Sequence, residues 1–116
     1  MSTCTLYYNA ECSKCRGALE LIEAHGVAPA IVHYLDTPPG ADELRRLVDL
    51  LGGDPRVLLR TGEPEYAGLG LDDRSLSPDA LIAALIAHPR LLERPILVAD
   101  GKAVIGRPPQ RVLDIL

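Results

Sequence analysis

The sequence predicts an α/β domain in which a β-α-β unit and a β-β-α unit flank a helical insertion. Near the N-terminus, apolar runs at 3–8 and 30–35 surround a helical pattern that starts at Ser13. Near the C-terminus, residues 94–106 contain two apolar runs around an Asp-Gly turn, and a second helical pattern follows. This order of elements is that of a thioredoxin-like fold.

The first 35 residues predict one β-α-β unit. Gly26 is a natural end for its helix, since glycine commonly follows a helix C-terminus. The crossover through this helix favours parallel pairing of the two strands. One face of the helix carries the apolar residues Cys15, Ala18, Leu19 and Ile22 at helical spacing.

The middle of the chain predicts a helical insertion over about 37–92, inside a single domain that spans 1–116. Asp54 and Ser77 are suited to cap helices, because each is followed directly by a proline. Helical segments are expected at 41–51, 54–60, near Tyr66, at 77–88 and from the prolines at 108–109 to the C-terminus.

Composition and charge exclude several classes of protein. The formal net charge is -4, which argues against a dedicated nucleic-acid binder. No apolar run approaches the roughly 20 residues that a membrane helix needs, and no secretory segment opens the chain. We therefore expect a cytoplasmic protein that contacts neither membrane nor nucleic acid and acts as a monomer. In that compartment thiols stay reduced, so the three cysteines indicate reactivity or burial rather than a disulfide scaffold.

Cys12 immediately precedes the first predicted helix and is the candidate nucleophile. The unpaired N–H groups and the positive dipole end of a helix favour a thiolate there. The dipole contributes only about 0.3–1 kcal/mol, against roughly 1.4 kcal/mol per pKa unit, so a strongly activated Cys12 needs a further cation. Lys14, Arg16 or a distant residue could supply that charge. The same N–H groups can bind a tetrahedral oxyanion.

Cys15 completes a Cys-x-x-Cys pair with Cys12, a pattern typical of redox chemistry at a strand-to-helix junction. Two interpretations of Cys15 remain open. It is either a resolving thiol that attacks an adduct on Cys12, or a small core residue on the buried helix face. A zinc site is disfavoured, because it needs two further ligands at matching spacing. The remaining candidates, Cys4, His25, His33 and His88, have no such spacing.

Three arginines have settings that suggest a functional role, although any single surface arginine is most often a solvated charge. Arg60 ends the segment 54–60, Arg94 directly precedes Pro95, and Arg107 directly precedes a second proline. An X-Pro bond before a strand is a place where a cis peptide occurs. In a thioredoxin-like fold, a cis Pro95 would bring Arg94 beside the Cys12 loop.

Five segments of the sequence together point to a known family, and they are spread in order over nearly the whole chain. They are "YYNAECSKCR", "IVHYLDTPP", "LLR", "LLERPILV" and "IGRPPQRVLDIL". On these segments the sequence resembles the glutaredoxin-coupled arsenate reductase (ArsC-like) family, especially its short bacterial members. The resemblance implies a thioredoxin-like fold, a catalytic Cys12, and a cis bond before Pro95. It also implies an oxyanion site formed by Arg60, Arg94 and Arg107, whose guanidinium groups match a tetrahedral anion.

The resemblance further implies that the Cys12 thiolate attacks arsenate, that glutathione attacks the adduct, and that glutaredoxin then removes the glutathione. No bound cofactor or metal is expected, and glutathione is a cosubstrate. Supporting roles are expected for Asn9, Ser13, Arg16 and Pro95.

Three positions depart from the family's usual residues. Tyr8 stands where the best-known members have a His that tunes the thiolate, Ala10 replaces a proline, and Cys15 replaces a non-thiol residue. The Cys-x-x-Cys pair also resembles the Spx-type regulators. The alternative functions are therefore a redox-sensing interaction protein, or a general thiol-disulfide oxidoreductase, that uses a Cys12–Cys15 disulfide.

Overall fold

The computed structural model describes residues 4–116, which form two compact units. One unit contains residues 4–37 and 94–116, and the other contains residues 38–93. The predicted insertion at 37–92 matches the second unit within one residue at each end. The strand predicted at 3–8 is found from Cys4, and Thr3 lies outside the described residues.

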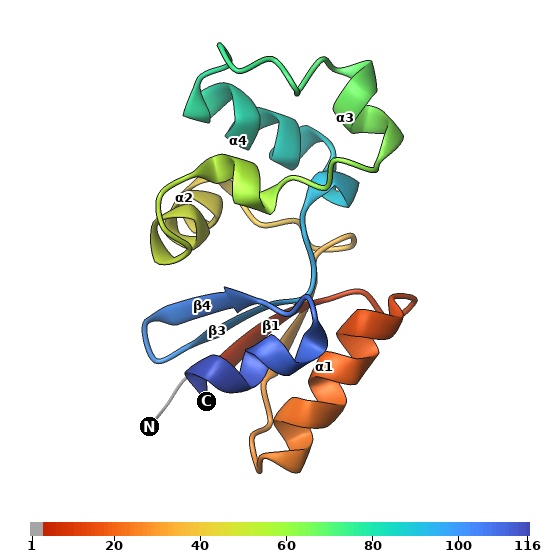
Figure 1. The fold of residues 1–116 in the computed structure, drawn as a ribbon, viewed down its shortest axis with the longest axis vertical. Helices are drawn as coiled ribbons and strands as arrows, with labels where there is room; N and C mark the ends of the chain where they lie inside the picture. Colours follow the sequence, from red (N-terminus) through yellow and green to blue (C-terminus); the bar gives the residue numbers. More distant parts are fainter. Residues whose placement is uncertain (1–3) are drawn as a thin grey trace. The chain divides into compact units, whose positions relative to one another are not determined.

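The first unit is a four-stranded sheet of order β2-β1-β3-β4 with helices packed on it (Figure 1). As expected from the crossover, β1 (Cys4–Tyr8) pairs in parallel with β2 (Ala30–His33). On its other side β1 pairs antiparallel with β3 (Ile96–Ala99), which pairs antiparallel with β4 (Lys102–Ile105). The β3–β4 turn places Asp100 at φ 51° and Gly101 at φ 75°, as a two-residue hairpin turn requires.

The two helices of this unit are α1 (Ser13–Ala24) and η3 (Pro109–Ile115), which lie side by side (Figure 1). Both bury apolar residues against the same face of the sheet. The core formed there consists of Leu6, Ala18, Ile22, Leu97, Val104 and Val112. This packing fixes the start of α1 at the carboxyl end of β1, where ligands bind in open α/β sheets.

The second unit is entirely helical apart from one isolated β-bridge between Leu59 and Leu92. Ser77 and Asp54 cap helices here as predicted, by accepting hydrogen bonds from Ala80 N and Arg56 N. The helices are α2 (Ala41–Leu50), η1 (Pro55–Leu58), α3 (Pro64–Gly68), α4 (Pro78–Ala87) and η2 (Pro89–Leu91). Within the described residues, no helix is long and apolar enough to cross a membrane.

The C-terminal helix is found where it was predicted, and it is of the 3-10 type, with i→i+3 hydrogen bonds such as Arg111 N to the Pro108 carbonyl. One predicted strand needed correction. The strand expected at 30–35 ends at His33, because the His33 carbonyl accepts hydrogen bonds from Asp36 N and Thr37 N and so closes a turn.

A second correction concerns Arg60, which does not end a helix. The helix η1 stops at Leu58, and the chain then runs extended. The Arg60 N–H donates to the Leu91 carbonyl at 2.8 Å, and Glu93 N donates to the Leu58 carbonyl at 2.7 Å. These hydrogen bonds between distant segments replace helical hydrogen bonds, and they align the segments that carry Arg60 and Glu93 within this unit.

Candidate active site

The loop between β1 and α1 is a tight turn built by Asn9. The Asn9 carbonyl accepts a hydrogen bond from Cys12 N at 3.0 Å, and its Oδ1 accepts one from Glu11 N at 3.0 Å. A side chain that pairs with the backbone two residues on is a common turn former for asparagine. Asn9 therefore holds the backbone turn that presents Cys12.

Cys12 is the N-cap residue of α1, with extended backbone angles of φ -93° and ψ 118°. Its side chain closes no capping hydrogen bond as a thiol, yet it faces the free N–H groups of the first helical turn. Burial alone would raise the pKa of Cys12. Interactions with the Cys15 N–H and thiol, the Arg94 side chain and the Lys14 N–H outweigh burial and lower the pKa to about 7. A large share of Cys12 is therefore thiolate at neutral pH.

Arg94 is the cation that, together with the helix start, lowers the pKa of Cys12. The predicted helpers Lys14 and Arg16 act differently. Lys14 contributes through its backbone N–H. The Arg16 side chain instead donates from Nη1 to the Ala10 carbonyl at 2.8 Å, which holds the loop. Ser13 is the exposed first residue of α1, where its N–H belongs to the unpaired first turn.

Cys15 is fully buried, on the helix face with Ala18 and Ile22. Burial is the largest cause that raises the pKa of its thiol, to about 12, and the nearby Cys12 raises it further. Cys15 therefore stays protonated at neutral pH. In this state its S–H can donate to the Cys12 thiolate, which is a role that neither interpretation from the sequence had included.

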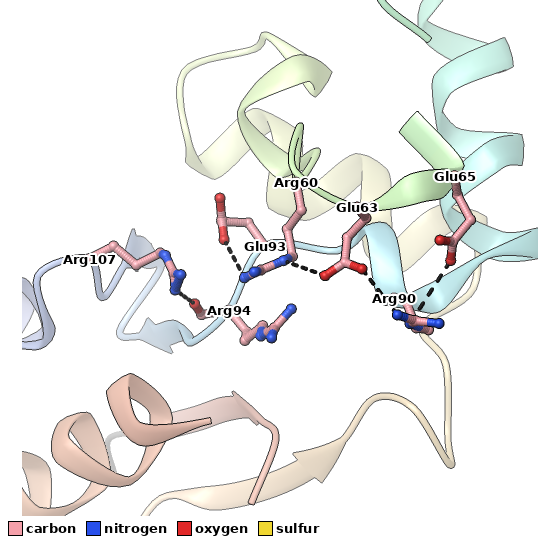
Figure 2. Close-up of polar contacts among 7 residues, drawn as sticks. All are labelled: Arg60, Glu63, Glu65, Arg90, Glu93, Arg94 and Arg107. Carbon is pink, nitrogen blue, oxygen red and sulfur yellow. Dashed lines mark hydrogen bonds and ion pairs between the residues drawn. The ribbon is translucent and has the colours of Figure 1, made fainter. Parts of the chain in front are cut away.

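Arg94 reaches Cys12 from the segment that enters β3. The Arg94–Pro95 peptide bond is cis, as the family resemblance implied. The Pro95 carbonyl accepts a hydrogen bond from Gly106 N at 2.9 Å. Arg107 donates from Nη1 to the Arg94 carbonyl at 3.3 Å (Figure 2). Arg94 and Arg107, which are separated by 12 residues, are thus brought together within the unit that contains Cys12.

Two features of this segment were missed by the sequence prediction. The Arg107–Pro108 bond is also cis. Gly106 is the second: a Cβ there would lie 2.9 Å from Pro95 Cγ and 3.1 Å from Val112 Cγ1. In the sequence, Gly106 lies between an apolar run and an Arg-Pro pair, and this position could have indicated that the residue must be small.

Arg60 belongs to the second unit, where two carboxylates hold it (Figure 2). Its Nε lies 3.2 Å from Glu63 Oε1, and its Nη1 lies 3.3 Å from Glu93 Oε1. Glu63 also pairs with Arg90 at 3.2 Å, and Arg90 reaches Glu65 at 4.0 Å. The pairing of Glu63 and Glu93 with Arg60 had not been predicted from the sequence.

A comparison with protein families decides what kind of chain this is. The model of the ArsC family matches residues 7–115. This chain belongs to the ArsC family. The family resemblance and the predicted fold are therefore confirmed, and the segments that carried the resemblance lie inside the matched region except for Leu116.

Individual relatives agree with this ArsC-family membership. The arsenate reductase of Neisseria meningitidis serogroup A is 45% identical over 96% of both chains. The Escherichia coli protein YfgD, which is uncharacterized, is 50% identical over 96% of this chain and 94% of its own. The structure of the arsenate reductase from Vibrio cholerae superimposes with a TM-score of 0.95, at 47% identity and 98% coverage of both chains.

Proposed function

We propose that this ArsC-family protein is an arsenate reductase that works through a covalent adduct on Cys12. The observation that carries the proposal is the Cys12 thiol itself: it lies at a helix start, interacts with Arg94, and has a pKa of about 7. The relatives named arsenate reductase match this chain over nearly its full length, which supports the same substrate.

Arsenate binding is proposed to use the helix start and guanidinium groups. A tetrahedral oxyanion fits the N–H groups of the first helical turn and the planar fork of arginine. Arg94 and Arg107 would bind it from the unit that contains Cys12. Arg60 is predicted to supply a third guanidinium, with Glu63 and Glu93 fixing its orientation.

The first chemical step would be a substitution at arsenic. The Cys12 sulfur forms an S–As bond, and one arsenate oxygen leaves as water after protonation. Arsenic stays As(V) in this step, so no reductant is needed. The protein's contributions are an ionised nucleophile and positive charge around the anion.

The second step would be the reduction, with glutathione as cosubstrate. The glutathione sulfur bonds to Cys12 sulfur, the S–As bond breaks, and its electron pair remains on arsenic, which leaves as arsenite, As(III). Two thiols have then been oxidised to one mixed disulfide. A glutaredoxin thiol takes the glutathione and restores Cys12. We propose a cytoplasmic reaction, because it consumes reduced glutathione, and we propose no bound cofactor.

The test is arsenate-dependent NADPH oxidation in the presence of glutathione, glutathione reductase and glutaredoxin. Cys12→Ser should reduce turnover to background, since a hydroxyl with an ordinary pKa is not ionised at neutral pH. Cys4→Ser is the matched control and should keep wild-type turnover, because Cys4 lies at the far end of β1. A folded wild-type protein that shows no turnover at any arsenate concentration would disprove the proposal.

A further inference from the structure

Arg60 belongs to a chain of ion pairs formed by five side chains of the second unit (Figure 2). Glu63 and Glu93 contact Arg60 itself. Arg90 links Glu63 to Glu65. Apart from Arg90, these side chains are mostly buried, with exposed fractions between 15% and 21%. The chain of ion pairs contains two arginines and three glutamates, so its formal charge is -1, although Arg60 is expected to bind an anion.

This charge balance is unfavourable for arsenate at Arg60. A glutamate carboxylate accepts hydrogen bonds from a guanidinium group in the same planar geometry as the oxygens of a tetrahedral anion. Glu63 and Glu93 therefore hold two of the donor nitrogens of Arg60, Nε and Nη1, and their charges repel a further anion. Arsenate gains most at Arg60 when one of the two carboxylates gives up its contact.

Glu63 is the carboxylate that is held more firmly. Its Oε1 lies 3.2 Å from Arg60 Nε, and its Oε2 lies 3.2 Å from Arg90 Nη2. Its backbone N–H also donates to the Arg60 carbonyl at 3.4 Å, which fixes the two residues relative to each other. Displacement of the Glu63 side chain would break two ion pairs at once.

Glu93 is the carboxylate that an anion can replace at lower cost. Its Oε1 lies 3.3 Å from Arg60 Nη1, which is the longer of the two contacts and uses a terminal nitrogen of the guanidinium group. Glu93 is also the last residue of the second unit, where the chain continues directly into Arg94. If Glu93 withdraws, Glu63 still orients Arg60 through Nε.

We propose that Glu93 is an internal carboxylate ligand of Arg60 that arsenate displaces when it binds, so that Glu93 sets the affinity for the substrate. Without substrate, Glu93 compensates a guanidinium group whose side chain is only 20% exposed, which avoids the cost of a poorly solvated charge. With substrate, arsenate takes over this compensation. The inference rests on the proposed function, in which Arg60 is a ligand of arsenate.

The direct test measures arsenate binding by calorimetry in the full chain carrying Cys12→Ser, which cannot form the adduct. Adding Glu93→Gln keeps the size of the side chain and an acceptor for Arg60 Nη1, but it removes the competing charge. Affinity for arsenate should rise roughly two- to fivefold, as expected for one partly exposed charge pair. Glu65→Gln is the matched control, because Glu65 is a carboxylate of the same chain of ion pairs that contacts Arg90. It should leave the affinity unchanged.

A double-mutant cycle shows whether Arg60 carries the effect. In an Arg60→Gln background, Glu93→Gln should no longer raise the affinity, since no guanidinium group remains for the two anions to share. Glu63→Gln should not reproduce the rise, because an amide has one acceptor oxygen where two arginines are paired, and Arg60 is loosened. Unchanged affinity in Glu93→Gln, an equal rise in Glu65→Gln or Glu63→Gln, or a rise that persists without Arg60 would overturn the exchange at Glu93.

Steady-state kinetics separate this inference from the proposed function. With Cys12 present, Glu93→Gln should lower KM for arsenate by a similar factor and leave KM for glutathione unchanged. An unchanged or raised KM for arsenate in a variant that turns over would overturn the inference alone. Tighter arsenate binding in Glu93→Gln, together with no turnover by the wild-type protein, would overturn the proposed function and leave the exchange at Glu93 standing.

Discussion

Cys12 should show its activation as a pH-dependent reactivity. Its pKa is lowered from an ordinary 9.0 to about 7, so the reactive thiolate is present above neutral pH and is lost as the pH falls. We expect the rate of Cys12 alkylation by iodoacetamide to rise with a midpoint near pH 7 and then level off. The Cys4→Ser variant removes the other partly exposed thiol from the measurement. A midpoint near pH 9 would show that the helix start and Arg94 do not activate the sulfur.

Arg94 should account for part of that activation. Removing its charge in Arg94→Gln should raise the alkylation midpoint by about one pH unit, because a nearby opposite charge stabilises the ionised form. Arg94→Lys should restore part of the effect, since it returns the charge without the planar fork. Arg111→Gln is the control, because Arg111 is exposed in η3. An unchanged midpoint in Arg94→Gln would exclude Arg94 from the nucleophile's environment.

Cys15 should be dispensable as a resolving thiol. Cys15→Ser keeps a side-chain donor toward Cys12, so glutathione-dependent turnover should stay within a few-fold of wild type. Cys15→Ala removes the donor and should raise the alkylation midpoint of Cys12 without abolishing turnover. Turnover that disappears in both variants would establish Cys15 as the resolving thiol. It would also revive the disulfide-based alternatives that the Cys-x-x-Cys pattern left open.

Local sequence signals predicted the nucleophile but not its environment. The position of Cys12 at a helix start follows from the turn residues and the apolar spacing behind it. The apolar spacing also predicted a buried face for Cys15, but the pKa of about 12 that this burial gives its thiol depends on the assembled core. Likewise, the contact of Arg94 with Cys12 joins residues 82 apart in the chain, and only the expected fold and the family resemblance pointed to it.

At the scale of elements, the β4–η3 junction supports the segment that carries Arg94. Gly106→Ala would place a methyl group 2.9 Å from Pro95 Cγ and 3.1 Å from Val112 Cγ1. Because both neighbours are buried or constrained, we expect a loss of roughly 1–3 kcal/mol in the free energy of unfolding. Reduced arsenate affinity should accompany the loss, since Arg94 and Arg107 flank these contacts. Chemical denaturation and steady-state kinetics measure the two effects.

Gly62→Ala is the matched control for this change. A Cβ at Gly62 would meet nothing within 4 Å, and its φ lies outside the left-handed region. Its stability should therefore change by only a few tenths of a kcal/mol, or rise slightly through lower entropy of the unfolded chain. If Gly106→Ala proves as stable as Gly62→Ala, the segment around Pro95 must relax more easily than its contacts indicate.

Elements were predictable where periodicity and end signals agreed. The helix α4 has a Ser-Pro start and continuous apolar spacing, and the predicted range of 77–88 is close to the observed Pro78–Ala87. Where tertiary hydrogen bonds compete with local ones, the prediction failed. The segment 54–60 has a helical start at Asp54, but the Arg60 N–H and the Leu58 carbonyl pair with the segment near Leu92. That pairing is invisible to any local pattern.

At the scale of the whole molecule, the order of elements was enough to predict the fold. A β-α-β unit with a right-handed crossover and a β-β-α unit leave few ways to complete one sheet. The observed order β2-β1-β3-β4 follows, with the only parallel pair among the described strands at β1–β2. The proline-rich stretch after Thr37 and the Arg94–Pro95 step lie at the boundaries between the two units.

The positions of the three cysteines bear on which thiol could attack an adduct on Cys12. A disulfide requires Cα atoms about 4.4–6.8 Å apart. Cys4 starts β1 and Tyr8 ends it, a separation of roughly 13 Å at about 3.3 Å per residue, and Cys12 lies beyond Tyr8. Cys15 is close to Cys12 but buried and protonated. Cys15 is therefore the one described cysteine near enough to Cys12 for an internal disulfide, and its burial and raised pKa disfavour its attack on an adduct.

Turnover should consequently depend on an external monothiol. Glutathione with glutaredoxin should sustain arsenate-dependent NADPH oxidation. Thioredoxin with its reductase should give only background, because thioredoxin reduces disulfides and we predict that no Cys12–Cys15 disulfide forms during turnover. When glutaredoxin is omitted, intact mass spectrometry should find one glutathione on Cys12. Robust turnover with thioredoxin alone, together with a Cys12–Cys15 disulfide by mass, would mean that α1 opens enough during the reaction to expose and ionise Cys15.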